Sequence, residues 1–259
     1  MSELAEGLAP LRADPRLSAI LLDVDGTLAP IVRHASDAQV PQPTRSSLIA
    51  VARRYGLVAC VSGRPAAVAR RIVSIGSITY LGNHGCETLS GGSTHVELDP
   101  DVVAWEGAVR EFYAAVDATA LERLRVLRED KGPIVAFHWR GARDEEAARA
   151  AIAVIETRAL AAGLHVHWGR KVLEVRPPVP IGKGRGIATL LGAKQLAAGL
   201  YVGDDATDID AFRGLRASVP QAVCVAVRSE ETPPELEREA DLMVDGPPGV
   251  RDLLEELLG

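Results

Sequence analysis

The sequence predicts a doubly wound, parallel α/β fold into which a second, smaller α/β domain is inserted. Strand-like and helix-like segments alternate near both ends of the chain, and this order produces a parallel sheet with helices on both faces. Between about residues 103 and 177 the order changes, and short paired strands replace the alternation. We therefore assign residues 1–102 and 178–259 to a core domain and residues 103–177 to an insert.

The core begins with two apolar strands. Ser18–Asp23 and Leu57–Val61 are continuous apolar runs without polar alternation, as expected of strands that are buried on both faces. A helix is predicted between them, over about Thr44–Tyr55. Pro65 suits the start of a second helix that runs to about Ser74.

The same order returns near the C-terminus. Helices are predicted over about 183–196, 207–215 and 249–258, and strands over 199–203, 222–227 and 240–245. In the insert we predict helices over about 102–119 and 144–162 and strands over about 123–130, 134–140, 165–168 and 171–176. The prolines of residues 177–180 suit a stiff linker back to the core.

Composition and charge exclude several classes of protein. The 259 residues are enough for two compact units, and a formal net charge of −6 argues against a nucleic-acid partner while allowing a small anionic substrate. Cys60, Cys86 and Cys224 form no CxxC pair, which argues against a disulfide framework and a zinc site. We see no leader and no apolar run approaching the roughly 18 residues of a membrane span. We expect a cytoplasmic monomer without a membrane partner.

Two carboxylates, Asp23 and Asp25, directly follow the first buried strand in the sequence Asp-Val-Asp-Gly-Thr. Such a strand brings its carboxyl end to the crevice where ligands bind in open α/β sheets. One carboxylate can attack phosphorus while the other protonates the leaving oxygen and later activates water. A calcium loop starting at Asp23 is excluded, because it would need Gly at Leu28 and Glu at His34. A plain turn or helix cap remains the alternative.

A second acidic group, Asp204, Asp205 and Asp208, follows the strand that ends at Gly203. Three acids in five residues repel one another and usually need a cation. Oxygen ligands at a site that also contains Asp23 and the Asp25 carbonyl would suit Mg²⁺. The alternative is a solvated loop with a helix cap, and the sequence leaves open which of these acids binds the metal directly.

Two shorter motifs supply positive charge and hydrogen-bond donors. Ser62 with the backbone of Gly63 and Arg64 can hold a phosphoryl oxygen, although a helix cap is the ordinary reading of such a serine. Lys183, between two glycines at a helix start, can place an ammonium against the transferring group, although this motif by itself favours a surface lysine in a glycine-rich turn. Together the four motifs provide what phosphoryl transfer requires, in which positioning and charge neutralisation dominate.

These four motifs resemble those of the haloacid dehalogenase superfamily, which has a Rossmann-like core. The resemblance implies a phospho-aspartyl intermediate on Asp23, with Asp25 as general acid and base. It implies Mg²⁺ held by Asp23, the Asp25 carbonyl and Asp204. Asp205 and Asp208 would then hold these ligands in place without binding the metal themselves. An acid two residues after the nucleophile is typical of the phosphatases and mutases of the superfamily.

Longer stretches of core and insert resemble the trehalose-6-phosphate phosphatases. They are Asp23–Ile31, Gly82–Gly85, Glu129–Gly132, His138–Arg140, Gly169–Pro177 and Gly203–Phe212. The resemblance implies that the insert is a cap that closes over the core and contacts the sugar. The residues that would bind the substrate are Gly63, Arg64, Asn83, His84, Lys131, His138, Arg140, Lys171 and Glu174. Val24, Pro133, Trp139 and Ile209 replace residues more usual in that family.

For some of these residues the sequence gives evidence that is independent of the resemblance. Lys131, Lys171 and Lys183 are three of only four lysines in the chain, and all three fall on family positions. Glu174 lies in an otherwise apolar strand, where it could accept a sugar hydroxyl or simply face outward. His138 and Arg140 would share one strand face, or would belong to a solvated surface.

The sequence therefore predicts a Mg²⁺-dependent phosphatase acting on trehalose 6-phosphate. The nearest alternatives keep the site and change the substrate to sucrose phosphate, mannosyl- or glucosyl-phosphoglycerate, or another sugar phosphate. A phosphomannomutase-like phosphotransferase and a non-enzymatic sugar-phosphate sensor are the remaining alternatives.

Overall fold

A computed structural model of the chain describes residues 3–32, 34–169, 171–192, 194–230 and 232–259. Arg170, in one of the resembling stretches, and Ala193, in a predicted helix, lie outside these residues. The chain divides into two compact units, one of residues 1–97 and 181–259 and one of residues 98–180. Among the described residues, no helix has both the length and the apolar composition that a membrane crossing needs.

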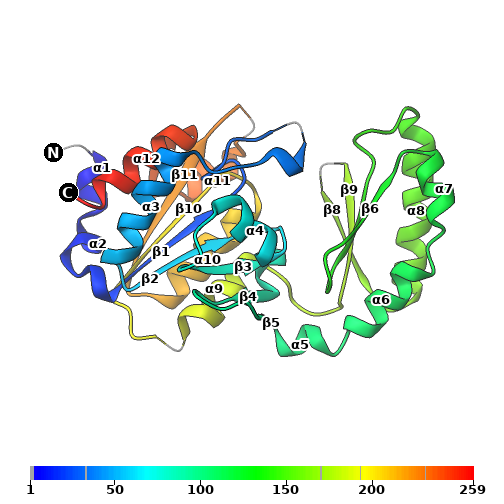
Figure 1. The fold of residues 1–259 in the computed structure, drawn as a ribbon, viewed down its shortest axis with the longest axis horizontal. Coiled ribbons are helices and arrows are strands. Elements are labelled where there is room, and N and C mark those ends of the chain that lie inside the picture. The colour runs from blue at the N-terminus through cyan, green and yellow to red at the C-terminus, as the bar shows by residue number, and fades with distance from the viewer. Residues whose placement is uncertain (1–2, 33, 170, 193, 231) are drawn as a thin grey trace. The chain divides into compact units, whose positions relative to one another are not determined.

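The first unit is built on an eight-stranded sheet with the order β12-β11-β10-β1-β2-β3-β4-β5 (Figure 1). Its strands are β1 Ser18–Asp23, β2 Leu57–Val61, β3 Thr79–Gly82, β4 Glu87–Leu89, β5 Val96–Leu98, β10 Ala198–Gly203, β11 Gln221–Arg228 and β12 Leu242–Asp245. The six strands from β12 to β3 are parallel, and β4 runs antiparallel to β3. The doubly wound α/β class predicted from the sequence is confirmed.

Helices cover both faces of this sheet. They are α1 Glu3–Gly7, α2 Ala9–Ala13, α3 Gln42–Arg54, α4 Ala66–Val73, α9 Lys183–Gly192, α10 Thr207–Ser218, α11 Pro234–Glu239 and α12 Gly246–Glu256, with short 3-10 turns η1 Pro15–Leu17, η2 Ala35–Asp37 and η3 Asn83–Gly85. α3, α4 and α12 pack on the face that carries Ile20 and Leu22, whereas α9 and α10 pack on the face of Leu21. Both faces of β1 are buried, which explains why its four central residues, 19–22, are all apolar.

The second unit is a four-stranded antiparallel sheet with the order β6-β7-β9-β8 and helices on one face. Its elements are α5 Pro100–Val103, α6 Glu106–Ala114, α7 Ala118–Arg123, β6 Leu127–Asp130, β7 Val135–His138, α8 Glu145–Ala161, β8 His165–Gly169 and β9 Val172–Arg176. Phe137, Leu173 and Val175 face its core, together with Val109 and Ile152 from the helices.

The structure corrects several predicted boundaries in this unit. The single helix predicted over 102–119 is wrong, because the Asp117 side chain accepts hydrogen bonds from Thr119 and Ala120 and so begins a new helix, α7. The strand predicted from residue 123 begins only at Leu127, since α7 ends at Arg123 and the backbone then turns through Arg125 with φ 56°. The strand predicted over 134–140 ends at His138.

Candidate active site

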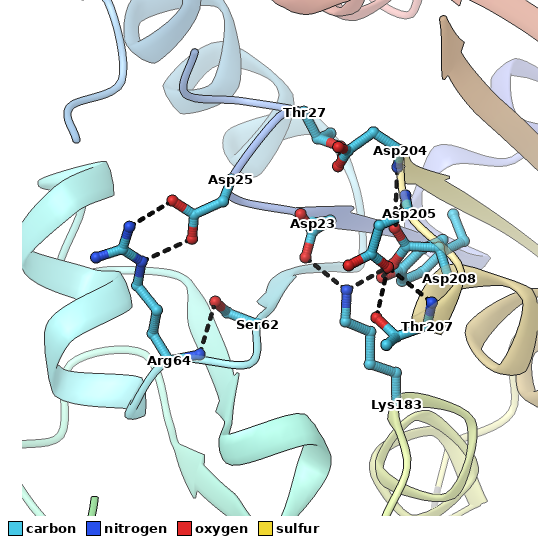
Figure 2. Close-up of polar contacts among 11 residues, drawn as sticks. Asp23, Asp25, Thr27, Ser62, Arg64, Lys183, Asp204, Asp205, Thr207 and Asp208 are labelled. Carbon is cyan, nitrogen blue, oxygen red and sulfur yellow. Dashed lines mark hydrogen bonds and ion pairs between the residues drawn. The ribbon is translucent and has the colours of Figure 1, made fainter. Parts of the chain in front are cut away.

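Three neighbouring strands end at the candidate site. Asp23 is the last residue of β1, Ser62 follows β2, and Asp204 follows β10. Because these strands are parallel and adjacent, their carboxyl ends lie at one edge of the sheet. Figure 2 shows the side chains of Asp23, Ser62, Lys183 and Asp204 gathered there.

A buried ion-pair cluster forms the centre of the site. Lys183 Nζ lies 2.7 Å from Asp23 Oδ1 and 2.7 Å from Asp208 Oδ1 (Figure 2). All three side chains are buried, with Asp208 fully so. An ammonium can be kept in such a place only when carboxylates compensate its lost hydration, so Lys183 is not the surface lysine of the alternative interpretation.

Burial and mutual charge shift the pKa values of these groups. Burial raises the pKa of Asp23 well above its usual range, against the opposing charge of Lys183 and with the help of Asp208. Burial alone would lower the pKa of Lys183, but Asp208 and Asp23 outweigh it and the pKa is raised. Lys183 therefore remains an ammonium directed at the predicted nucleophile.

The glycines around Lys183 allow the helix start to approach its neighbour. Gly184 N donates to Asp210 Oδ2 at 2.8 Å, and a Cβ on Gly184 would lie 2.3 Å from the Asp210 backbone oxygen. Gly214 of α10 faces Gly184 with equally little room. The sequence Gly-Lys-Gly thus lets α9 lie directly against α10, which brings Lys183 to Asp208.

The acidic loop is held by its own hydrogen bonds. Asp208 Oδ2 accepts from the backbone N–H groups of Asp204 at 2.9 Å and Asp205 at 3.0 Å. Thr207 donates to Asp205 Oδ1 from both its backbone nitrogen and its hydroxyl. Thr27 Oγ1 donates to Asp204 Oδ1 at 3.2 Å, which ties this loop to the one after β1.

Asp23, Asp204 and Asp208 fit a small divalent cation. Each offers a carboxylate oxygen, and these oxygens lie within 4.8 Å of one another. Burial, followed by the charges of Asp208 and Asp205, raises the pKa of Asp204 to about 7, which shows how unfavourable the crowded negative charge is without a counter-ion. An all-oxygen donor set is the kind that Mg²⁺ prefers.

Asp25 lies beside these groups and is paired with Arg64. The guanidinium binds both carboxylate oxygens, with Nε 2.7 Å from Oδ2 and Nη2 2.6 Å from Oδ1 (Figure 2). Arg64 also donates from Nη1 to the Ala35 carbonyl at 2.8 Å. Arg64, which the family resemblance implies for substrate binding, contacts the predicted general acid in this structure.

The loop after β2 is braced by the turn after β3. Ser62 N donates to Leu81 O at 2.9 Å, and His84 N donates to Ser62 O at 3.0 Å. Asn83 and His84 both adopt left-handed backbone conformations, with φ of 49° and 57°, a strain that often accompanies functional sites. A Cβ on Gly63 would lie 2.6 Å from the His84 ring, so His84 lies directly over Gly63.

In the second unit, a set of charged residues lies on the sheet face opposite the helices. Glu174 of β9 is buried, and its carboxylate bonds Lys131 Nζ at 2.8 Å and Arg176 Nε at 3.0 Å. His138 Nε2 lies 2.8 Å from Glu129 Oε2, and this hydrogen bond, against the effect of burial, lowers the pKa of Glu129. Glu174 therefore faces away from the helices, as the alternative interpretation expects, but it is buried between Lys131 and Arg176. We call Glu129, Lys131, His138, Glu174 and Arg176 the charged face.

Two predicted substrate residues of this unit, Lys171 and Arg140, form no described contact with the charged face. Lys171 has φ 58° and forms an ion pair with Glu145 at the start of α8. Arg140 is exposed and lies in the turn after β7. The expectation that Arg140 shares a strand face with His138 is therefore wrong, because the strand ends at His138 and Trp139 N bonds to Lys171 O.

Four further residues, not predicted from the sequence, contact the predicted site residues. They are Thr27 on Asp204, Tyr201 on Asp208, Asp210 on Gly184 and Arg176 on Glu174. Thr27 and Asp210 belong to motifs that were already recognised, so their positions offered a signal. For Tyr201 the sequence contained a single signal, which is a phenol within a strand whose other residues are apolar or glycine.

Comparison with known proteins agrees with this site. Residues 21–248 match the family model described as trehalose-phosphatase. The chain belongs to this family. The resemblance inferred from the motifs is confirmed, and the match covers both segments of the core together with the insert.

Individual members of the family are similar over most of this chain. A trehalose-phosphate phosphatase of Mycobacterium marinum is 33% identical over 243 residues, which are 89% of this chain and 60% of that protein. A Mycobacterium tuberculosis protein named as uncharacterized glycosyl hydrolase Rv2006 is 34% identical over 223 residues, 83% of this chain but 16% of that protein. The chain thus spans less than two thirds of either relative.

A solved structure shows the same fold. The C-terminal domain of C. albicans trehalose-6-phosphate phosphatase matches this chain with a TM-score of 0.73 at 21% identity. The match covers 99% of this chain and 96% of that one. At this identity the likeness concerns the fold, with its parallel core sheet and its inserted unit.

Proposed function

We propose that this protein is a Mg²⁺-dependent phosphatase that hydrolyses trehalose 6-phosphate to trehalose and phosphate through a phospho-aspartyl intermediate. The observation that carries the proposal is the buried Asp23, which shares Lys183 with Asp208 and lies in an oxygen cluster with Asp204. A plain turn or a helix cap would not need a buried ammonium and three converging carboxylates. Membership of the trehalose-phosphatase family supports the same reaction.

Asp23, the backbone carbonyl of Asp25 and Asp204 would hold the Mg²⁺, with Asp205 and Asp208 supporting them. When bound, the ion would neutralise charge on the phosphoryl oxygens. The carboxylate oxygens of Asp208 already accept hydrogen bonds from Lys183 and from two backbone N–H groups, which favours a supporting role for it.

In the first step, an Asp23 carboxylate oxygen attacks phosphorus in line with the sugar oxygen. The bond from phosphorus to the sugar oxygen breaks, and Asp25 gives its proton to that oxygen. Arg64 must first leave Asp25, since the guanidinium covers both oxygens of the carboxylate. The products of this step are the sugar and an aspartyl phosphate on Asp23.

In the second step, Asp25 takes a proton from water while the water oxygen attacks phosphorus. The bond between phosphorus and Asp23 breaks, which restores the carboxylate and releases phosphate. Lys183 and the Ser62 hydroxyl, with the backbone of Gly63, stabilise the phosphoryl oxygens in both steps. The released guanidinium of Arg64 can then bind the same group.

The sugar contacts are proposed for the insert, acting as a cap. Lys131, His138 and Glu174 of the charged face offer donors and acceptors, which would exchange their present partners for sugar hydroxyls. Arg140 and Lys171 extend this set, and Asn83 and His84 add to it from the core. The cytoplasmic location, the monomeric state and the absence of nucleic-acid and membrane partners stay predictions.

Phosphate release from a panel of sugar phosphates tests the proposal. The panel contains trehalose 6-phosphate, sucrose 6-phosphate, glucose 6-phosphate and mannosyl-phosphoglycerate, each with Mg²⁺ or with EDTA and without a bisphosphate activator. We expect Mg²⁺-dependent release, fastest from trehalose 6-phosphate. Faster release from another substrate would correct the sugar, a need for a bisphosphate would indicate a phosphotransferase, and tight binding without turnover would indicate a sensor.

A further inference from the structure

Tyr201 places a phenol hydroxyl against the acidic loop. It lies in β10, between the apolar residues Leu200 and Val202, and its side chain is fully buried. Its hydroxyl donates to Asp208 Oδ1 at 2.6 Å. The ring packs edge-on against Phe212, with the ring centroids 5.9 Å apart.

The hydroxyl completes the hydrogen bonding of Asp208. Oδ1 accepts from Tyr201 and Lys183, and Oδ2 accepts from the backbone nitrogens of Asp204 and Asp205. An ionised carboxylate has about four acceptor positions, so these four donors satisfy it. A fully buried carboxylate that lost one of them would gain no water in return.

We propose that Tyr201 is a positioning residue of this active site, whose hydroxyl fixes the Asp208 carboxylate so that Asp208 can orient both Lys183 and the backbone of Asp204. The inference rests on the phosphatase function proposed above. It adds a residue that acts through Asp208 and does not touch the substrate. The two oxygens of Asp208 lead to different groups: Oδ1 to the ammonium on the nucleophile, and Oδ2 to the loop that carries Asp204.

The hydroxyl matters separately from the ring. Burial, followed by the charge of Asp208, raises the pKa of Tyr201 well above its usual range, so the phenol keeps the proton that it donates. A phenylalanine would retain the packing against Phe212 and remove only the oxygen. Without this donor, Asp208 can rotate toward Lys183, and the two bonds from Oδ2 to the loop are weakened.

Tyr80 offers a matched control. It is also fully buried in the same sheet, in β3, and its hydroxyl also donates at 2.6 Å, but to the Ile75 backbone carbonyl. Tyr201→Phe and Tyr80→Phe therefore remove the same atom from similar environments. Only the first removes a donor from the site.

The experiment compares wild type, Tyr201→Phe and Tyr80→Phe by steady-state kinetics and by thermal unfolding during a titration with Mg²⁺ alone. For Tyr201→Phe we expect kcat to fall about tenfold with KM within about twofold, since a hydrogen bond to a charged group is lost in the transition state. The Mg²⁺ concentration that gives half of the thermal shift should rise about tenfold, as for other groups that support a metal ligand. Tyr80→Phe should lose stability while keeping the wild-type kcat and Mg²⁺ response.

Several results would overturn the proposal. They are a Tyr201→Phe enzyme with kcat and Mg²⁺ response within about twofold of wild type, equal losses in the two variants, or a Tyr201→Phe protein that fails to fold while Tyr80→Phe folds. A double-mutant cycle with Asp208→Asn adds a check, because a residue acting through Asp208 should give strongly non-additive losses. If wild type releases no phosphate, the proposed function fails, and the Mg²⁺ titration still decides the role of Tyr201.

Discussion

The core and the insert hold their charged residues in different ways. In the core, Asp208 is held by the backbone N–H groups of the loop after β10, by Lys183 at the start of α9 and by Tyr201 within β10. On the charged face of the insert, Glu174 pairs with the side chains of Lys131 and Arg176, and His138 pairs with the side chain of Glu129. Backbone donors cannot turn away when a ligand arrives, whereas paired side chains can exchange partners. The difference suits chemistry in the core and sugar recognition in the insert.

The largest effect is expected from removing the proposed nucleophile. Asp23→Asn keeps the shape of the side chain but not its nucleophilic oxygen, and should lower phosphate release by about 10⁴-fold or more. Unfolding temperature and circular dichroism would check that the fold is retained. Activity near wild type would show that Asp23 is not the nucleophile. It would also contradict the assignment of the chemistry to the core.

Lys183→Met should lower kcat by about 10² to 10³, as expected when a donor to the transferring group is lost. The variant also leaves Asp23 and Asp208 without their shared ammonium, so thermal unfolding should be measured alongside. Lys194→Met is the matched control, because Lys194 is exposed and falls outside the motifs. A loss of less than about fivefold in Lys183→Met, or an equal loss in Lys194→Met, would contradict the role of the core ammonium.

Glu174→Gln should act on substrate binding. The amide keeps the shape of the side chain but loses the negative charge that holds both Lys131 and Arg176. KM for trehalose 6-phosphate should therefore rise about tenfold, while kcat changes less. Glu106→Gln breaks an exposed pair with Arg110 in the same unit and should leave both constants unchanged. A fall in kcat with unchanged KM would assign Glu174 to the chemistry.

The smallest effect is expected on stability, through Asp204. Burial, followed by the charges of Asp208 and Asp205, raises the pKa of Asp204 from its usual 3.8 to about 7 in the folded protein. The folded state binds more protons between these values, so the contribution of Asp204 to stability falls as pH rises from about 4 to 7. The proposed Mg²⁺ would bind the ionised form and should therefore restore stability most at the upper end of this window.

Thermal unfolding between pH 5 and 8, in EDTA and in Mg²⁺, measures this effect. The difference between the two conditions should grow with pH in wild type and should be much smaller in Asp204→Asn. A Mg²⁺ effect that is constant with pH, or unchanged in the variant, would show that Asp204 is not among the ligands.

The core could be predicted from the sequence because its pattern is local. β1 and β2 are apolar runs that lead directly into the Asp23 and Ser62 motifs, so the sequence alone predicts both residues at the carboxyl ends of strands. The boundaries in the insert could not be predicted as well. The break before α7 depends on a side-chain cap at Asp117. In the core, the strands β4 and β5 have only three residues each, which are too few for a periodic pattern.

The partners of the site residues could not be predicted at all. Arg64 and Asp25 are 39 residues apart, and Tyr201 and Asp208 are brought together only by the packing of α10 on β10. Sequence motifs identified which chemical groups are present, but which group holds which depends on side-chain directions that long-range packing decides.

Two substrates can test the proposal that the core carries the chemistry and the insert recognises the sugar. Rates with trehalose 6-phosphate and with p-nitrophenyl phosphate, which has no sugar, should be compared in wild type, Asp23→Asn and Glu174→Gln. We predict that Asp23→Asn abolishes both reactions, whereas Glu174→Gln loses activity on trehalose 6-phosphate and keeps the wild-type rate on p-nitrophenyl phosphate. Equal losses on both substrates in Glu174→Gln, or phosphate release by Asp23→Asn, would contradict the account.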